Sequence, residues 1–233
     1  MTALSAGYPL KFKPVLDDYV ISSTYIAELL GGPANDVLLI TRNTRDESGA
    51  STTTNYTVAE YEYYTSLKYG NLSSAYQQLY PAGNNSTSAS TSWNNAARDT
   101  SLVSSWAFGT EWVKSAQSPF YTYYWDHAPP SQDSGASHQS EIMYALNSLY
   151  ANADTYSYTD YDYYLGEVMS NYLANFVKTL DPNDGGAVPA QWEPNDGVNE
   201  TVMRLGEAFG PTKIAESEQV DLIMACFAQQ SPY

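Results

Sequence analysis

Short apolar runs and longer amphipathic stretches divide this chain into expected strands and helices. The run at 37–41, VLLIT, has a β-branched residue at each end and follows a Gly/Pro/Asn-rich turn. A run this short with these flanks predicts a strand buried on both faces, as in a parallel sheet. Residues 119–125, PFYTYYW, combine aromatic and β-branched side chains and predict a second strand.

Helical spacing dominates the remainder. Residues 161–180 carry apolar side chains three and four positions apart and predict an amphipathic core helix. Further helices or helix-like pieces are expected at 24–32, 56–80, 98–117, 141–150 and 216–229. The Asn/Ser/Thr-rich stretch 83–95 predicts a polar surface loop. Two expected strands among many helices indicate an α/β fold with few sheet strands and a predominantly helical remainder.

Charge narrows the possible partners. The chain has 233 residues, with 10 Lys and Arg against 26 Asp and Glu, a formal net charge of −16. Such an excess repels phosphate backbones and anionic lipid headgroups, so neither nucleic acid nor a membrane is expected as a partner. Two histidines and one cysteine, without clustered acidic ligands, predict no metal site, and no cofactor is expected.

The cellular compartment is left open by the residues themselves. Asn-X-Ser/Thr acceptor sites favour export, although chance accounts for several in a chain this rich in Asn, Ser and Thr. They lie at Asn55, Asn71, Asn84, Asn85 and Asn199. Residues 1–25 contain Pro, Lys and Asp where a signal peptide needs an apolar block, so any export signal is expected upstream of Met1.

A carboxylate and a histidine follow the two expected strands. Glu47 lies just past the first strand, and His138 lies 13 residues past Trp125, in a Gly/Ser loop that precedes a helix. Catalytic groups of open α/β sheets gather at the carboxyl ends of strands. A carboxylate beside a histidine suits a proton relay. Taken alone, these residues favour a histidine that merely packs or caps a helix.

Several motifs, in one consistent order, resemble the type-B carboxylesterases, the family of cholinesterases and fungal lipases and esterases. NTRDES at 43–48 resembles the family's acid turn, and GASHQSEI at 135–142 its histidine loop. NYLANFVKTLDPN at 171–183, Trp192 and the aromatic strand that ends in WDHAPP also match. The resemblance runs from about residue 9 to the end of the chain. It implies that 1–233 form the C-terminal part of an α/β-hydrolase domain, with an incomplete sheet.

The resemblance also implies roles for individual residues. His138 corresponds to the general base and acid of a Ser-Glu-His triad, and Glu47 to the carboxylate that orients it. Glu141 corresponds to a supporting acid, and Asp46 is the rival of Glu47 for the orienting role. His127, in WDHAPP, matches a position without a catalytic duty.

Two elements of the family's machinery are missing from this sequence. It contains no Gly-X-Ser-X-Gly nucleophile motif and no His-Gly-Gly-Gly segment for an oxyanion hole. The chain is therefore expected to be inactive alone, as a C-terminal fragment that acts on a small ester only when an N-terminal half completes it. The strand at 37–41 then has an unpaired edge, through which the chain is expected to self-associate.

Smaller departures concern turn and packing positions. Ser48 replaces the family's glycine, although Gly49 follows it and offers the same freedom. Where many members have a helix cysteine that bonds to one near the C-terminus, this chain has Ser104 or Ser105. The resemblance therefore implies that Cys226 is unpaired.

The alternative is a non-enzymatic binding module on an esterase scaffold. The chain has 22 tyrosines, dense at 56–64, 121–124 and 156–164. Such rings can stack on sugars or line a partner surface. Tyrosine at helical spacing is more often packed into a core, and this favours the esterase interpretation.

Overall fold

A computed structural model describes residues 15–229 and shows an open, four-stranded mixed sheet. Its order is β1 (Leu39–Thr44), β2 (Phe120–Trp125), β3 (Thr201–Leu205) and β4 (Gly210–Lys213). The first three strands run parallel, and β4 pairs antiparallel with β3. The predicted α/β class is confirmed. Most of the segment expected to lack a signal peptide, 1–25, lies outside the described residues.

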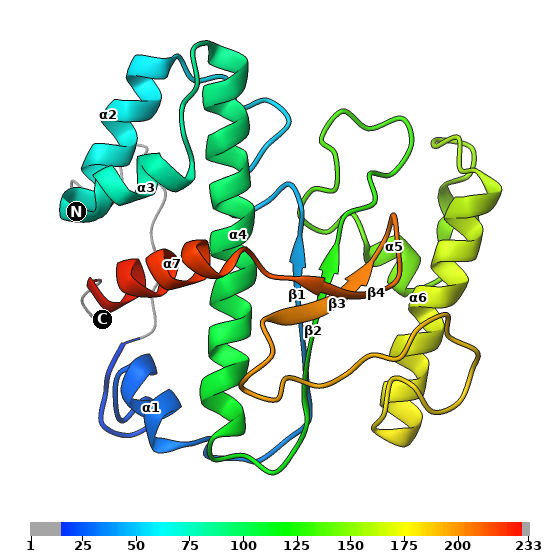
Figure 1. Ribbon diagram of the computed structural model, residues 1–233. Helices are drawn as coiled ribbons and strands as arrows, with labels where there is room; N and C mark the ends of the chain where they lie inside the picture. Colours follow the sequence, from blue (N-terminus) through cyan, green and yellow to red (C-terminus); the bar gives the residue numbers. More distant parts are fainter. Residues whose placement is uncertain (1–14, 230–233) are drawn as a thin grey trace, which may run out of the picture.

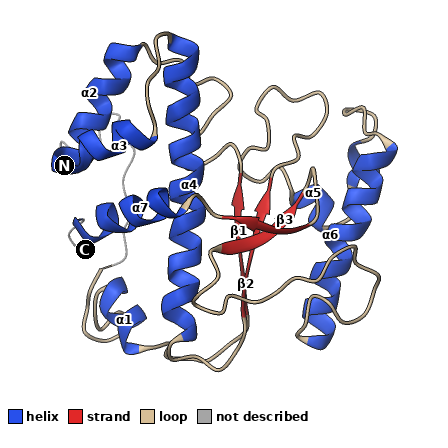
Figure 2. Cartoon of the chain, in the orientation of Figure 1, coloured by secondary structure: helices blue, strands red, loops and turns tan. Residues whose placement is uncertain are grey.

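Helices cover both faces of this sheet (Figure 1). On one side lie the long α4 (Ser86–Val113) and α7 (Ser217–Gln229), and on the other lie α5 (Ile142–Ala145) and α6 (Asp160–Thr179). Three further helices flank α4 on the side away from the sheet (Figure 2). They are α1 (Tyr25–Gly31), α2 (Val58–Tyr69) and α3 (Ser73–Leu79). Two short 3-10 helices, Gly70–Leu72 and Leu149–Asn152, complete the elements.

The core follows from the sequence patterns of β2 and α6. Five of the six β2 residues are buried, as expected of a central strand with helices on both faces. Thr159 begins α6 with a capping box that includes Asp162, and the apolar stripe of the helix packs on β2 and β3. The predicted core helix at 161–180 is thus confirmed, as are the helices at 24–32 and 216–229.

The first strand differs from the prediction. It covers Leu39–Thr44 and so begins and ends later than the run at 37–41. Its register with β2 continues to the pair Thr44 and Trp125, so pairing with β2 sets its end. Leu39 to Arg42 are only partly buried. The expectation of burial on both faces was wrong because β1 is an edge strand.

The expected loop at 83–95 is mostly helix, which corrects the prediction from composition. Helix α4 begins at Ser86 and runs for 28 residues. Asn85 caps it, because its side chain accepts a hydrogen bond from the Ser88 N–H while the Ser88 side chain bonds back to the Asn85 N–H. Small buried residues such as Ala89 and Ala96 then let the helix pack closely on α2 and α3.

Three other elements also differ. The helix expected at 141–150 is short, because Asn147 takes a left-handed φ of 47° and separates α5 from the following 3-10 helix. Strand β3 was not predicted. Strand β4 was not predicted either, since GPTK carries no alternating apolar pattern. It forms because it pairs with β3.

Removal of the Asn85 cap is expected to destabilise the chain. Asn85→Ala leaves the Ser88 N–H without its side-chain acceptor, and the free energy of unfolding should fall by about 1 kcal/mol. Urea unfolding of protein from a host that does not glycosylate measures this. The neighbouring Asn84→Ala, which removes no contact to the helix backbone, should stay within about 0.5 kcal/mol of the parent. Equal effects of the two variants would contradict the capping assignment.

Candidate active site

Glu47 and His138 lie in contact at the carboxyl end of the parallel sheet. The Glu47 Oε2 atom is 2.8 Å from the His138 Nδ1 atom. Glu47 follows β1 and His138 lies in the loop after β2, the strand beside β1. The second carboxylate oxygen, Oε1, accepts a hydrogen bond of 2.8 Å from the Thr44 N–H, which holds the carboxylate in place.

The two side chains differ in exposure. The Glu47 side chain is 14% exposed, whereas the His138 side chain is 68% exposed. Within residues 15–229, the His138 Nε2 atom has no hydrogen-bond partner. One ring nitrogen is thus held by a half-buried carboxylate, while the rest of the imidazole is accessible.

Left-handed backbone shapes both turns of this pair. Ser48 and Gly49 have φ values of 56° and 105°, and Gln139, directly after His138, has a φ of 70°. Ser48 therefore adopts this conformation itself, in addition to Gly49, at a cost that glycine would not incur. Such strain persists only where the surrounding contacts impose it.

The pKa of the Glu47 carboxyl lies below its ordinary value. Burial acts to raise this pKa, but the hydrogen bonds from the Thr44 N–H and from His138 stabilise the charged form and outweigh burial. Glu47 is therefore ionised at neutral pH. An ionised carboxylate on Nδ1 favours the tautomer with the proton at Nδ1 and leaves Nε2 able to accept a proton.

Asp46 does not contact His138. It is therefore not placed to orient the imidazole, the role for which the sequence made it a rival of Glu47. Its side chain, 1% exposed, accepts from Arg98 on α4 at 2.6 Å and from Arg45 at 3.0 Å. It also accepts from the Ala136 N–H of the histidine loop at 2.9 Å. Burial raises the pKa of Asp46, and the hydrogen bonds from the two arginines hold it below its usual range.

Glu141 lies in the histidine loop itself, three residues after His138. Its side chain is 2% exposed and forms an ion pair with Arg42 of β1, which ties the loop to the first strand. Within residues 15–229 Glu141 forms no hydrogen bond with the imidazole, which is bonded by Glu47.

Arginines are the site residues that sequence reasoning missed. The chain has four, and each pairs with a carboxylate whose side chain is at most 7% exposed. The pairs are Arg42 with Glu141, Arg45 and Arg98 with Asp46, and Arg204 with Asp126. Arg42 directly precedes the acid turn NTRDES and Arg45 lies within it, a signal that the sequence contained.

The second histidine is built into the interior. The His127 Nε2 atom is 2.8 Å from Asp162 Oδ1, and its Nδ1 atom is 2.7 Å from Glu207 Oε1. Tyr144 donates to the same Asp162 oxygen at 2.6 Å. His127 thereby ties the loop after β2 to the start of α6 and to the turn between β3 and β4.

The tyrosine-rich segments divide between the core and the surface. Tyr121 and Tyr123 of β2 are buried, as is Tyr61 of α2. Exposed rings lie on α2, at Tyr63 and Tyr64, and on α6, at Tyr161, Tyr163 and Tyr164. The part of the chain that the structure describes shows no cluster of three potential metal ligands. None of its helices is long and apolar enough to span a bilayer.

Acid and histidine on the loops after two adjacent parallel strands place this chain among α/β proteins with a hydrolase-type arrangement. The family model for carboxylesterases matches residues 5–223. The chain belongs to the carboxylesterase family, and its fold is of the α/β-hydrolase type. It is similar to human bile salt-activated lipase, with 30% identity over 90 residues. That match covers 38% of this chain and 12% of the lipase.

Stability is expected to fall at acidic pH. The pKa values of Asp46, Glu47 and Asp162 are all lowered in the folded chain. The stability that these groups contribute is therefore present above their ordinary pKa values of about 4 and is lost as the pH falls through the lower folded values. Urea midpoints between pH 6 and pH 3 measure this. Asp46→Asn should lower stability at neutral pH and weaken the acid dependence; an unchanged dependence would contradict the role of Asp46.

Proposed function

We propose that this chain supplies the acid and histidine of a Ser-Glu-His triad for the hydrolysis of small carboxylic esters. The contact of 2.8 Å between Glu47 and His138, with the imidazole otherwise exposed, carries the proposal. In this mechanism Nε2 of His138 takes the proton from a serine hydroxyl and returns it to the leaving alcohol. Glu47 holds the tautomer and stabilises the imidazolium.

The nucleophile comes from another stretch of polypeptide, because this sequence contains no Gly-X-Ser-X-Gly. The free edge of β1 supports such a complement. The backbone N–H groups of Leu39 and Arg45 donate hydrogen bonds toward β2. The N–H groups of the alternate residues Ile40 and Arg42 therefore point away from β2. Within residues 15–229 no strand lies beyond that edge. A parallel strand added there would deliver its carboxyl end beside Glu47.

Exposed apolar residues also support the proposal that another stretch of polypeptide packs against this chain. No residue of α1 is buried, and Tyr25, Leu30 and Val37 before β1 are all about half exposed or more. Without the complement, we propose that this surface and the β1 edge associate with a second copy of the chain. Analytical ultracentrifugation tests this: a monomer at all concentrations contradicts it.

An ester assay tests the function. The purified chain alone should hydrolyse a short-chain p-nitrophenyl ester only at the background rate. Co-expression with a carboxylesterase N-terminal half that carries Gly-X-Ser-X-Gly should produce turnover. Glu47→Gln or His138→Ala should then reduce kcat by about 10³- to 10⁴-fold. Turnover that survives both substitutions would show that the pair has no part in the reaction.

We also propose that the chain is exported. All five Asn-X-Ser/Thr asparagines are exposed in the structure, as attachment of a glycan requires. Expression behind a signal peptide in a secretory host, followed by endoglycosidase treatment, tests this. A mobility shift on treatment is expected, and an unmodified chain contradicts the proposal.

A further inference from the structure

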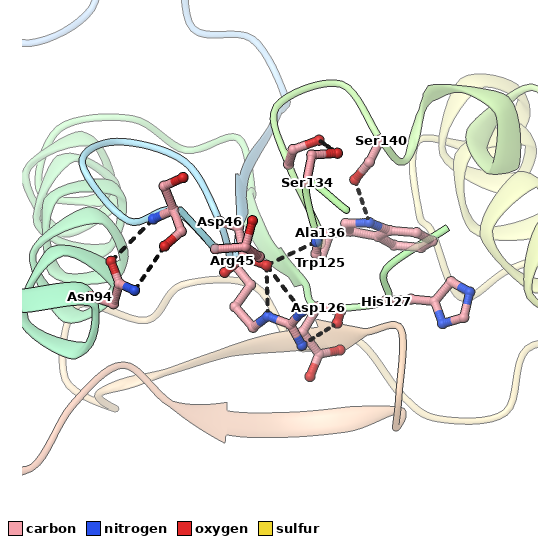
Figure 3. A network of polar contacts seen from close by, with 12 residues as sticks. Arg45, Asp46, Asn94, Trp125, Asp126, His127, Ser134, Ala136 and Ser140 are labelled. Carbon is pink, nitrogen blue, oxygen red and sulfur yellow. Dashed lines mark hydrogen bonds and ion pairs between the residues drawn. The ribbon is translucent and has the colours of Figure 1, made fainter. Parts of the chain in front are cut away.

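A network of polar contacts around Asp46 joins the acid turn to segments that are distant in the sequence. Figure 3 shows its contact with Ala136 and the contacts of Arg45 with Asp46 and Asp126. The carboxylate belongs to the acid turn after β1. It accepts from Arg98 of α4 and from the Ala136 N–H, two residues before His138. The Asp46 N–H in turn donates to the Ala136 carbonyl at 2.9 Å. Both sides of the peptide backbone at Ala136 are therefore held by the same residue.

Backbone pairing continues this contact toward the histidine. Asp46 and Ser137 form an isolated parallel bridge, in which Ser137 is the residue directly before His138. Glu47 directly follows Asp46. The two loops thus meet in a fixed register one residue before each member of the acid and histidine pair. A slip of one residue would turn either side chain away from the other.

The close approach of Gly135 to Asp46 makes this network specific to a glycine at position 135. Gly135 has a φ of 69°, and a Cβ atom there would collide with the Asp46 carboxylate. The histidine loop therefore packs its backbone directly against the carboxylate. Arg45 adds a second restraint, since it binds Asp46 and also donates to the Asp126 carbonyl after β2 at 2.9 Å.

We infer that Asp46 is a positioning residue, which sets the register between the acid turn and the histidine loop so that Glu47 meets Nδ1 of His138. The inference rests on the proposed function, because it gives Asp46 a part in assembling that pair. Asp46 does not touch the imidazole and transfers no proton. Its two arginines neutralise it, so that the negative charge opposite His138 is that of Glu47 alone.

Nuclear magnetic resonance of ¹⁵N-histidine-labelled chain tests this directly, because the chain has only two histidines. The Nδ1 proton of His138 should give a hydrogen-bonded resonance that Glu47→Gln removes. Asp46→Asn should also remove it, although Glu47 is intact, while the His127 resonances persist as a sign of intact packing. Asp126→Asn, which disrupts another buried carboxylate and arginine pair, should leave the His138 resonance in place.

The outcomes separate the two proposals. If Glu47→Gln leaves the His138 resonance unchanged, the pair itself is absent in solution and the proposed function fails. If Glu47→Gln removes the resonance but Asp46→Asn preserves it, Asp46 is not a positioning residue. If Asp46→Asn fails to fold, Gly135→Ala and Arg98→Gln replace it, because they disturb the same polar network from the histidine loop and from α4. A His138 resonance retained in both variants overturns the inference.

Discussion

Trp192→Ala should be among the most destabilising single substitutions in this chain, with a loss of about 3 to 5 kcal/mol in the free energy of unfolding. The indole is 1% exposed and lies between the sheet and α6. It packs edge to face on Tyr121 and Tyr123 of β2 and on Tyr172 of α6, with ring centroids 5.6 to 5.7 Å apart. Alanine leaves a large cavity and removes three aromatic contacts at once.

Urea unfolding followed by circular dichroism measures this loss. Trp192→Phe is the matched control, because it keeps an aromatic ring and also removes the indole N–H, which has no hydrogen-bond partner within residues 15–229. Its cost should be clearly smaller, because its cavity is smaller. Trp192→Ala could instead cost less than about 1 kcal/mol, as is typical of an average point substitution. That result would show that the tyrosines collapse into the space left by the indole.

Replacement of the two histidines should lower the free energy of unfolding by very different amounts. His127→Ala removes one of the hydrogen-bond donors of Asp162, which is 2% exposed, and should cost about 1.5 to 3 kcal/mol. Burial raises the pKa of Asp162, but hydrogen bonds from Thr159, Tyr144 and His127 keep that pKa low, so the carboxylate stays charged when one donor is lost. His138→Ala, on an exposed ring, should stay within about 0.5 kcal/mol of the parent.

Parallel urea titrations of the two variants at pH 7 make the comparison. Asp162→Asn combined with His127→Ala is the matched control, because removal of the charge together with its partner should recover part of the loss. Equal stability of His127→Ala and His138→Ala would contradict the structural role of His127. A large loss for His138→Ala would instead show that the histidine loop depends on its imidazole to fold.

Local pattern was sufficient for elements whose signals lie in adjacent residues. The aromatic run of β2 and the periodic stripe of α6 each carry enough apolar surface to define their own burial. Local sequence pattern failed for elements whose structure depends on pairing or packing with distant residues. Strand β4 exists because β3 pairs with it, and the Asn/Ser/Thr-rich start of α4 is helical because Asn85 caps it and small residues pack beneath α2 and α3.

The sequence by itself determined the family and the α/β class and nominated Glu47 and His138 as candidate site residues, because motif order and hydrophobic periodicity are properties of neighbouring residues. Only the tertiary structure decided that these two side chains meet, that Asp46 faces Arg98 and Ala136 instead of the imidazole, and that His127 is internal. Each of these depends on contacts between residues about 35 to 90 positions apart. Such contacts are set by strand register and helix packing, which no local pattern encodes.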